Sequence, residues 1–430
     1  MATDLLKSHS GYSVTPTAVS HTGQLPSNLP CEDTWCSGQY VHFNDSSKDW
    51  CQWALFDGHA GARTSEFLKD AVPGVVGGDL VRAKCMDKPY VPNDMHIFRT
   101  IQKAFRFVDD ELINHGSRSI ESDSAALCDV VATAASAYAG SCALMAIFDP
   151  AKSILRVANV GDSRAVLGRW NGSNYVAEPM STDHTGFNQD EVARLQSEHP
   201  GEDVVDPRTG RIHGLAVSRA FGDGRWKWVE SITKKAHEKF FGPAPRPNGV
   251  IKTPPYLTAE PEIKETRVNE GDHPDFLIMA SDGLWDLMSS EDAVTCVQMW
   301  LGKNNPIQFL QQKESAQAPS WGTFWKSSEP PVAPPTYYST LDLLGENDEV
   351  YYDENEKCLR WKVSPKHFVV EDDNCGVHLI KNALGGKRRD LFTGVLTVQP
   401  PYSRNVRDDI TVHVIFFGID PSKTTKHLRS

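Results

Sequence analysis

The sequence predicts a mixed α/β protein whose sheets are mainly antiparallel, and three observations indicate this. Apolar runs of strand length alternate with stretches of helical periodicity through much of the 430 residues. Three successive strand-like stretches between residues 141 and 179 are joined by tight turns, and such sequential pairing is antiparallel rather than doubly wound. Hydrophobic residues make up 40% of the chain and charged residues 23%, which is ordinary for a globular protein.

The first elements are a strand and two helices. "CQWALF" (51–56) is a predicted strand, and residues 62–72 form the helix that follows it. A longer helix covers 94–116 and ends at Gly116. Its apolar face repeats at helical spacing, through Ile97, Ile101, Phe105, Val108 and Leu112.

The later elements are mainly strands. Residues 141–149, 153–170 and 174–179 are the three predicted strands, followed by a short helix over 188–199 that Asn188 caps. "DFLIMASDGLWDLM" (275–288) is an apolar strand that runs into Asp-Gly, as "CQWALF" does, and "ITVHVIFF" (410–417) is a last strand preceded by an acidic pair.

Composition excludes several classes of protein. The net charge of −12 disfavours nucleic acid as a partner and suits divalent cations. No stretch approaches the roughly 18 uninterrupted apolar residues that span a bilayer. The nine cysteines are scattered without a CxxC pair or a secretory signal peptide, which favours an intracellular, reducing compartment over a disulfide framework. The first 25 residues do not form an Arg-rich transit peptide.

Two segments have the composition of insertions. Residues 225–261 are rich in Trp, Lys and Pro, and residues 302–373 contain "SEPPVAPP" followed by an acidic run. We interpret the second as a lid or surface excursion. Length alone would allow about three domains, or a single large domain that carries such insertions.

Four aspartates stand at predicted strand ends: Asp57, Asp162, Asp282 and Asp408. Each alone is explained as a turn or cap residue. If the strands pair antiparallel, however, all four could gather at one edge, where each pair at about 5 Å would repel by roughly 3 kcal/mol at an effective dielectric of about 20. Either they do not meet, or cations neutralise them. Oxygen ligands alone favour Mg²⁺ or Mn²⁺ over zinc.

The turn "FDGHAG" adds a histidine to this edge. His59 lies two residues beyond Asp57, where it is a candidate general acid, although a lone histidine near a turn is more often structural. Gly58 lacks a Cβ, so its carbonyl can approach a metal ion. No P-loop, GxSxG elbow, thiol-phosphatase loop or HExxH helix offers a competing chemistry.

Seven motifs in order resemble the metal-dependent, type 2C protein serine/threonine phosphatases. They are "CED" (31–33), "FDGHAG" (56–61), "GSCA" (140–143), "VANVGDSRAVL" (157–167), "LAVSRAFGD" (215–223), "SDGLWD" (281–286) and "RDDIT" (407–411). The pyruvate dehydrogenase phosphatase branch is most similar, through "LPSNLPCED", "RLQSEHP", "AFGDGRWKW" and "TPPYLTAEPE". Asn28 supports this placement, because most family members carry a phosphate-binding Arg four residues before the Glu of the first motif.

The resemblance implies a fold and a set of domain limits. The fold is a central antiparallel β-sandwich flanked by helices, an α/β protein in the layered α+β sense, with lid-like insertions. A single catalytic domain covers 28–419 with insertions at about 225–261 and 302–373. Residues 1–27 are then an N-terminal extension, and 420–430 are a C-terminal tail.

The resemblance also implies the ligands of two metal ions, Mg²⁺ or Mn²⁺, that Asp57 bridges. Glu32 and the Gly58 carbonyl complete one ion, and Asp282 and Asp408 hold the other. Asp162 with Asp282 matches a weaker third site. The remaining implied positions are Asp33 and Asp286, which hold metal waters, Asn28 at the phosphate, and Cys142, which we interpret as a small buried residue.

The implied reaction is hydrolysis of phosphoserine or phosphothreonine by a water that bridges two ions, with His59 as the general acid. Similarity to the branch implies a mitochondrial matrix location, docking to a dehydrogenase complex, and the E1 component of a 2-oxoacid (pyruvate) dehydrogenase as substrate. Two alternatives stay open. One is a pseudophosphatase that binds phosphoproteins without turnover, and the other is a two-metal hydrolase of small phosphate esters.

Overall fold

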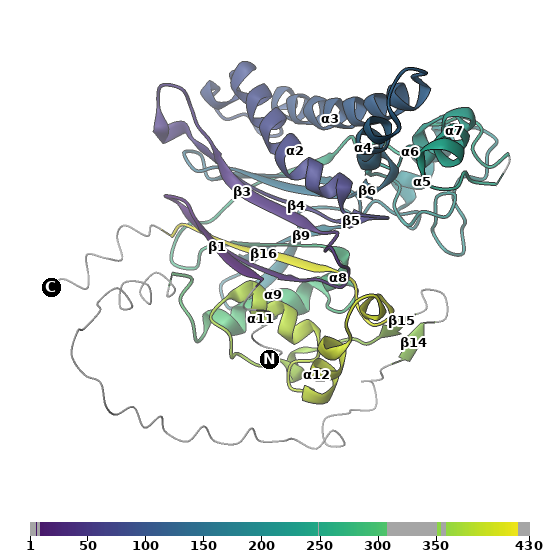
Figure 1. Ribbon diagram of the computed structural model, residues 1–430. Coiled ribbons are helices and arrows are strands. Elements are labelled where there is room, and N and C mark those ends of the chain that lie inside the picture. The colour runs from purple at the N-terminus through teal and green to yellow at the C-terminus, as the bar shows by residue number, and fades with distance from the viewer. Residues whose placement is uncertain (1–5, 7–8, 248, 308–350, 354–357, 420–430) are drawn as a thin grey trace, which may run out of the picture.

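The computed structural model describes residues 6, 9–247, 249–307, 351–353 and 358–419. Two antiparallel sheets stack face to face at its centre, which confirms the predicted β-sandwich (Figure 1). The first sheet has the order β1-β2-β16-β13-β9-β10, with the bounds Ser10–Val14, Ala18–Leu25, Ile410–Phe417, Phe276–Ala280, Arg164–Trp170 and Tyr175–Pro179. The second has the order β12-β8-β7-β4-β3, with the bounds Glu262–Arg267, Ile154–Val160, Ala143–Asp149, Trp50–Phe56 and Thr34–Tyr40.

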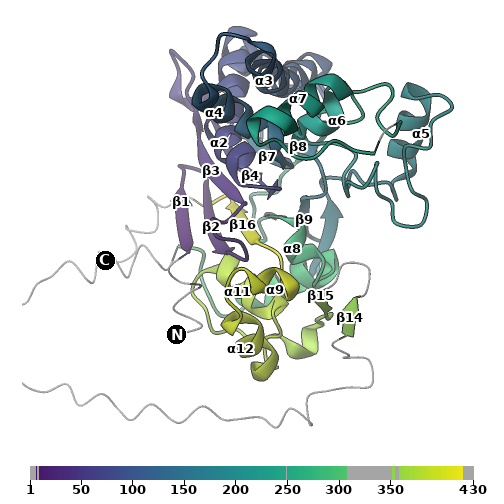
Figure 2. The same cartoon turned by 45° about the vertical axis from the view of Figure 1, so that its right-hand side comes forward.

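Helices cover both outer faces of the sandwich (Figure 1). The five-stranded sheet packs under α2 (Arg63–Arg82) and α3 (Met95–Glu121), with α4 (Leu127–Tyr138) beside them. The six-stranded sheet packs against α9 (Ser290–Leu301), α11 (Cys375–Ala383) and α12 (Arg389–Thr397). A lateral excursion carries α5 (Gln189–Glu198), α6 (Gly224–Lys227) and α7 (Glu230–Phe240) (Figure 2).

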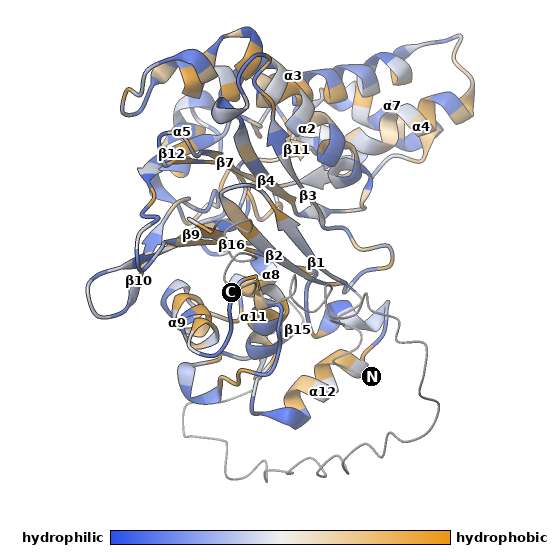
Figure 3. Cartoon of the chain, turned by 90° about the vertical axis from the view of Figure 1, so that its left-hand side faces the viewer, coloured by the Kyte–Doolittle hydropathy of each residue, from blue (hydrophilic) through white to orange (hydrophobic). Residues whose placement is uncertain are grey.

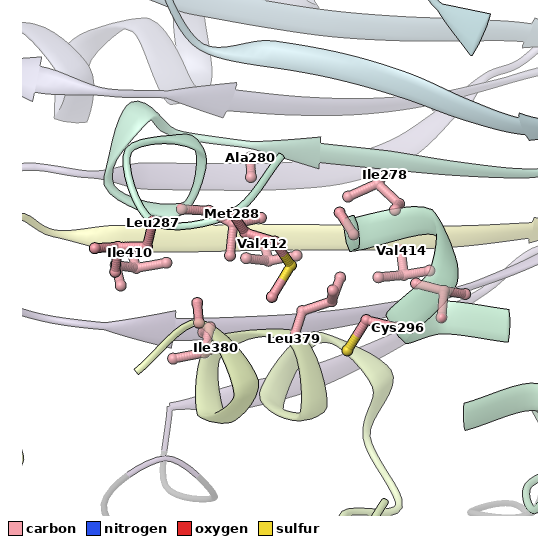
Figure 4. Close-up of a cluster of buried hydrophobic side chains, with 14 of the residues drawn as sticks. Ile278, Ala280, Leu287, Met288, Cys296, Leu379, Ile380, Ile410, Val412 and Val414 are labelled. Atoms are coloured by element: carbon pink, nitrogen blue, oxygen red, sulfur yellow. The ribbon is translucent and has the colours of Figure 1, made fainter. Parts of the chain in front are cut away.

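The core forms three layers because strands such as β4 are apolar on both faces. Trp53 and Phe148 of one sheet meet Leu277 and Phe417 of the other between the sheets. In the layer below, Figure 4 shows side chains of β13 and β16 pointing toward Leu379 of α11. Figure 3 shows the same division, with hydrophobic residues on the strands and hydrophilic ones on the outer faces of the helices.

Short elements complete the description of the chain. Three two-residue strands form a small sheet of their own, namely β5 (Gly58–His59), β6 (Gly140–Ser141) and β11 (Phe221–Gly222). The short helix α8 (Asp282–Trp285) follows β13. A separate hairpin pairs β14 (Tyr351–Asp353) with β15 (Cys358–Arg360). The described 3₁₀ helices are η1 (Ser46–Lys48), η2 (Cys85–Asp87), η4 (Pro365–His367) and η5 (Tyr402–Asn405).

Three sequence predictions about elements need correction. The stretch 153–170 is two strands, because the chain turns at Gly161 and crosses from β8 in one sheet to β9 in the other. The helix predicted to end at Gly116 continues to Glu121. A Cβ at residue 116 would lie 2.9 Å from the Cβ of Ala137, so this glycine permits close helix packing and does not end a helix. The helix predicted over 62–72 continues to Arg82.

The ends of the chain and the insertions differ in how far they are described. Residues 10–25, which the sequence assigned to an N-terminal extension, form β1 and β2, so the six-stranded sheet begins upstream of the predicted domain start. The 225–261 segment forms α6, α7 and an extended return. Most of 302–373, with its predicted lid function, and all of the 420–430 tail lie outside the described residues.

Strand register brings the predicted acidic ends to one edge of the sandwich. Ala280 of β13 pairs with Arg164 of β9 on one side and with Val412 of β16 on the other. The residues just after β13 therefore lie beside the turn between β8 and β9 and beside the start of β16. β4 ends at the same edge in the facing sheet, where the backbone N–H of Cys142 donates to the Asp57 carbonyl at 2.8 Å.

Candidate active site

Three of the four strand-end aspartates meet. Asp57 follows β4, Asp162 lies in the turn between β8 and β9, and Asp282 begins α8. Each offers one carboxylate oxygen, and these three oxygens lie within 4.8 Å of one another. We call this group the acidic cluster. The convergence that the strand-end pattern left open is therefore present.

Within the described residues, the three aspartates of the acidic cluster form no ion pair with a Lys, Arg or His side chain. Burial raises the pKa of Asp57 well above its ordinary value, and the charge of Asp282 raises it further. Burial and the charge of Asp162 do the same to the pKa of Asp282. Asp33, buried behind the cluster, has its pKa raised to about 7 by burial and by the charge of Asp409. Mutual repulsion of this kind disfavours the charged forms of these acids.

The residues of the cluster fit a hard divalent cation. Asp57 Oδ2 is buried and has no hydrogen-bond partner among the described residues, so one oxygen is already desolvated and available. The donor set contains oxygen only, which suits Mg²⁺ or Mn²⁺ and not zinc. A divalent ion would relieve the repulsion that raises the pKa values.

Two predicted ligands, Glu32 and Asp408, lie outside the three-oxygen group. Glu32 Oε1 accepts the backbone N–H of Gly61 at 2.6 Å. Asp408 Oδ1 forms an ion pair with Arg404 of η5 and accepts the N–H of Asp409 at 2.7 Å. The charge of Arg404 also lowers the pKa values of Glu32 and Asp282, although burial dominates both, so this guanidinium lies in the field of all three acids.

Asp409, the second residue of the acidic pair that precedes β16, has a structural role. Its side chain is buried and accepts backbone N–H groups from Ser27, Asn28 and Glu32, the last at 2.8 Å. It thereby ties the loop that carries Glu32 to the start of β16. The Asn28 amide is used in the same network, since its Nδ2 donates to Glu32 Oε2 at 2.8 Å and to Asp409 Oδ2 at 3.2 Å.

His59 is paired with an aspartate that the sequence did not single out. His59 Nε2 lies 2.7 Å from Oδ2 of Asp223, whose side chain is 1% exposed, whereas that of His59 is 24% exposed. Burial alone would lower the pKa of His59, but the charge and hydrogen bond of Asp223 outweigh it and hold the pKa above its ordinary value. A Cβ at Gly140 would lie 2.2 Å from His59 Nε2, so only glycine leaves room for this pair.

The structure gives a steric reason for glycine at position 58, which differs from the predicted approach of its carbonyl to a metal ion. A Cβ there would lie 2.3 Å from the Glu32 carbonyl oxygen, so glycine lets the Glu32 loop pack against β5. Asp286, predicted to hold metal waters, forms an ion pair with Arg360. Cys142 is buried, as predicted, and its thiol also donates to Asp162 Oδ1 at 3.3 Å, so it orients a residue of the acidic cluster.

Comparison with known proteins decides the family. The sequence profile described as "Protein phosphatase 2C" matches residues 27–320. A protein phosphatase 2C homologue of Schizosaccharomyces pombe is 37% identical over 404 residues, which cover 92% of this chain and 79% of that protein. The chain belongs to the protein phosphatase 2C family. It is therefore a metal-dependent protein serine/threonine phosphatase, as the seven motifs predicted.

Two further likenesses refine this placement. The mitochondrial [pyruvate dehydrogenase [acetyl-transferring]]-phosphatase 1 of Saccharomyces cerevisiae is 35% identical over 413 residues, which cover 92% of this chain and 68% of that protein. The phosphatase is thus most like the pyruvate dehydrogenase phosphatase branch. The crystal structure of a serine-threonine phosphatase 2C from Toxoplasma gondii matches with a TM-score of 0.50 and 17% identity, covering 95% of this chain and 99% of that one, and supports the fold.

The described part of the phosphatase contains no helix with the length and apolar composition that a bilayer crossing requires. Its eight described cysteines are all free thiols, and most are buried.

Proposed function

We propose that the acidic cluster is the metal centre of the phosphatase and that it holds two ions, Mg²⁺ or Mn²⁺. Asp57 would be a ligand of both, Glu32 and the Gly58 carbonyl would help to hold one, and Asp282 and Asp408 the other. Asp162 would contribute to a weaker third site. The observation that carries this proposal is the meeting of three partly buried carboxylates whose pKa values are raised and which form no ion pair with a cationic side chain of the described residues. Asp408 joins the centre when it releases Arg404.

In the proposed reaction, divalent ions held by these residues would supply an activated water for attack on phosphorus and would neutralise charge on the phosphoryl oxygens. His59 protonates the departing seryl or threonyl oxygen. Its Nε2–H is held by Asp223, so the proton that it gives up is the one on Nδ1. Asp223 keeps the imidazole protonated and in place, Asp33 and Asp286 hold water around the ions, and Asn28 faces the phosphate.

We propose a phosphoserine in the E1 component of a mitochondrial 2-oxoacid dehydrogenase as the substrate, with the mitochondrial matrix as the location and docking to the dehydrogenase complex. The support is the similarity to the yeast relative and to the mitochondrial [pyruvate dehydrogenase [acetyl-transferring]]-phosphatase 2 of Homo sapiens, which is 32% identical over 297 residues. The second match covers 66% of this chain and 48% of the human protein.

Phosphate release from a phosphoserine peptide tests the metal centre. We expect activity only with added Mg²⁺ or Mn²⁺, and a loss of about 10³-fold or more in Asp57→Asn, equivalent to about 4 kcal/mol of transition-state stabilisation. Asp272→Asn is the matched control, because Asp272 is exposed and precedes β13 at the end away from the cluster. Activity in Asp57→Asn equal to that of the control, or activity that survives a chelator, would contradict the proposal.

A further inference from the structure

A recess of about 720 Å³ opens beside Glu32 and Gly61. Leu29, Pro30, Pro400 and Pro401 line it, together with Arg63 at the start of α2. This volume lies within the range of about 300–1,000 Å³ that is typical of ligand pockets. The proposed chemistry uses Asn28 and Glu32 of its lining and leaves the apolar residues without a role.

The polar groups of the recess are already paired with one another. The Asn28 amide donates to Glu32 and Asp409, and both Glu32 oxygens accept hydrogen bonds. At the rim, Arg63 Nη1 lies 3.5 Å from Oε2 of Glu66, so the two exposed charges offset each other. The recess therefore presents no unpaired charge that would select a charged ligand.

What remains is an exposed apolar surface. Leu29 is 85% exposed, and it lies in the same recess as three prolines. The three prolines Pro30, Pro400 and Pro401 have no backbone N–H and offer rigid apolar faces. Burial of an aliphatic or aromatic side chain against such a surface is favourable, because it removes apolar area from water.

The recess shares Glu32 with the proposed metal centre, and Gly61, whose N–H binds Glu32, also lines the recess. The Ser27 N–H donates to Asp409, and Ser27 Oγ donates to the Arg407 carbonyl at 2.7 Å. These bonds tie the segment that carries Leu29 and Pro30 to the start of β16. A polypeptide that presents a phosphoserine to the acidic cluster can place a neighbouring residue in the recess.

We infer that this recess is a specificity site that binds an apolar side chain of the substrate polypeptide, within a few residues of the phosphoserine. The inference rests on the proposed function of the adjacent centre. It assigns to Leu29, Pro30, Pro400 and Pro401 the selection of aliphatic or aromatic residues over polar ones of similar size. An apolar side chain in a pocket of this kind is worth about 10-fold or more in kcat/KM.

A walk of leucine through a phosphopeptide tests this specificity site. In a Ser/Gly background, a single leucine is placed at each of the four positions before and after phosphoserine, and the matched series carries the nearly isosteric asparagine. With Mn²⁺ present, we expect leucine to exceed asparagine by about 10-fold or more in kcat/KM at one or two positions. Ratios within about twofold of 1 at all eight positions would overturn the inference.

Two variants assign the preference to the recess. Leu29→Asn should reduce the leucine-to-asparagine ratio at the preferred position to near 1. Phe43→Asn is the matched control, because Phe43 is 92% exposed on the connection between β3 and β4, at the end of β4 away from Asp57, and should retain the wild-type ratio. A preference that survives in Leu29→Asn would overturn the inference.

Hydrolysis of p-nitrophenyl phosphate by the wild type separates the two proposals, since this ester has no flanking residues. If it is Mn²⁺-dependent and lost in Asp57→Asn while the peptides show no preference, the metal centre stands and the specificity site fails. If neither the ester nor any peptide is hydrolysed, both proposals fail.

Discussion

Two groups of buried acids in this phosphatase have opposite electrostatics. Glu191 of α5 is 2% exposed, and its carboxylate is bound by Arg219 at 2.6 Å, Arg194 at 2.8 Å and the hydroxyl of Ser218 at 2.6 Å. Burial alone would raise its pKa, but the two guanidinium groups hold the pKa well below its usual range. The acidic cluster is partly buried, and its pKa values are raised by loss of solvent and by the charges of neighbouring carboxylates.

The difference distinguishes an acid that stabilises the fold from acids that can bind a ligand. Glu191 receives its cations from residues of the chain and so joins α5 to the strand-like segment at 218–219. Among the described residues the acidic cluster forms no such ion pair, and most of its charge remains available to an ion from solution. If this comparison is correct, metal should affect the cluster strongly and the Glu191 group hardly at all.

The largest expected effect is on activity. Asp282→Asn should lower kcat/KM by about 10³-fold or more and weaken Mn²⁺ binding measured by calorimetry without substrate, because it removes a ligand of the centre. Glu191→Gln, assayed below its unfolding temperature, should bind Mn²⁺ as the wild type does. Equal Mn²⁺ affinities for Asp282→Asn and the wild type would contradict the role of Asp282 as a metal ligand.

The next effect is on stability. Glu191→Gln should lower the free energy of unfolding by about 3–5 kcal/mol, because it leaves Arg194 and Arg219 without their buried partner. Urea unfolding with and without Mn²⁺ measures this, and the loss should be the same in both. Glu198→Gln is the control, since that residue is exposed and pairs only with Arg194. A similar loss in the control would contradict the assigned role of Glu191.

Metal should stabilise the wild type by an amount that depends on its concentration. At 100 times the dissociation constant, Mn²⁺ should add about 2.7 kcal/mol to the free energy of unfolding. The same addition should have little effect on Asp57→Asn. Thermal unfolding across a Mn²⁺ titration provides the measurement, and a wild-type curve that does not move would count against a metal centre.

Without metal, Asp57→Asn should be more stable than the wild type, by about 1–3 kcal/mol, because one of the repelling charges is gone. Urea unfolding in the presence of a chelator tests this sign. With saturating Mn²⁺ the order should reverse. A variant that is less stable under both conditions would show that Asp57 has a structural partner.

The smallest effect concerns pH. Asp223 holds the pKa of His59 above its ordinary value, so the imidazole stays protonated, as a general acid must, to higher pH. Asp223→Asn should shift the basic limb of the kcat profile to lower pH while leaving Mn²⁺ affinity nearly unchanged. A profile whose basic limb stays in place would assign that limb to another group.

Much of the fold was predictable because its signals are local. The strands that include Trp53 and Leu277 are buried on both faces, so they stand out as apolar runs bounded by turns. The positions of the three clustered aspartates were predictable for the same reason, since each follows such a run, but the pattern left open whether they meet. The change of sheet at Gly161 was missed because it has the same local turn chemistry as a hairpin.

The partners of the site were harder to predict because they join distant segments. His59 and Asp223 are 164 residues apart, and nothing in "AFGDGRW" marks Asp223 as the partner of a histidine. Asp409 and Asn28 are 381 residues apart. Gly140 carried a usable signal, because a glycine opening the "GSCA" motif indicates a close approach of some neighbour, but the sequence does not say of which.

Anomalous scattering from a crystal grown with Mn²⁺ tests the central claim most directly, because it locates the ions without reference to activity. We expect peaks within about 2.0–2.6 Å of carboxylate oxygens of Asp57 and Asp282, the range for divalent ions bound by oxygen. We expect none beside Glu191. A crystal with saturating Mn²⁺ whose peaks all lie away from Asp57 would contradict the account.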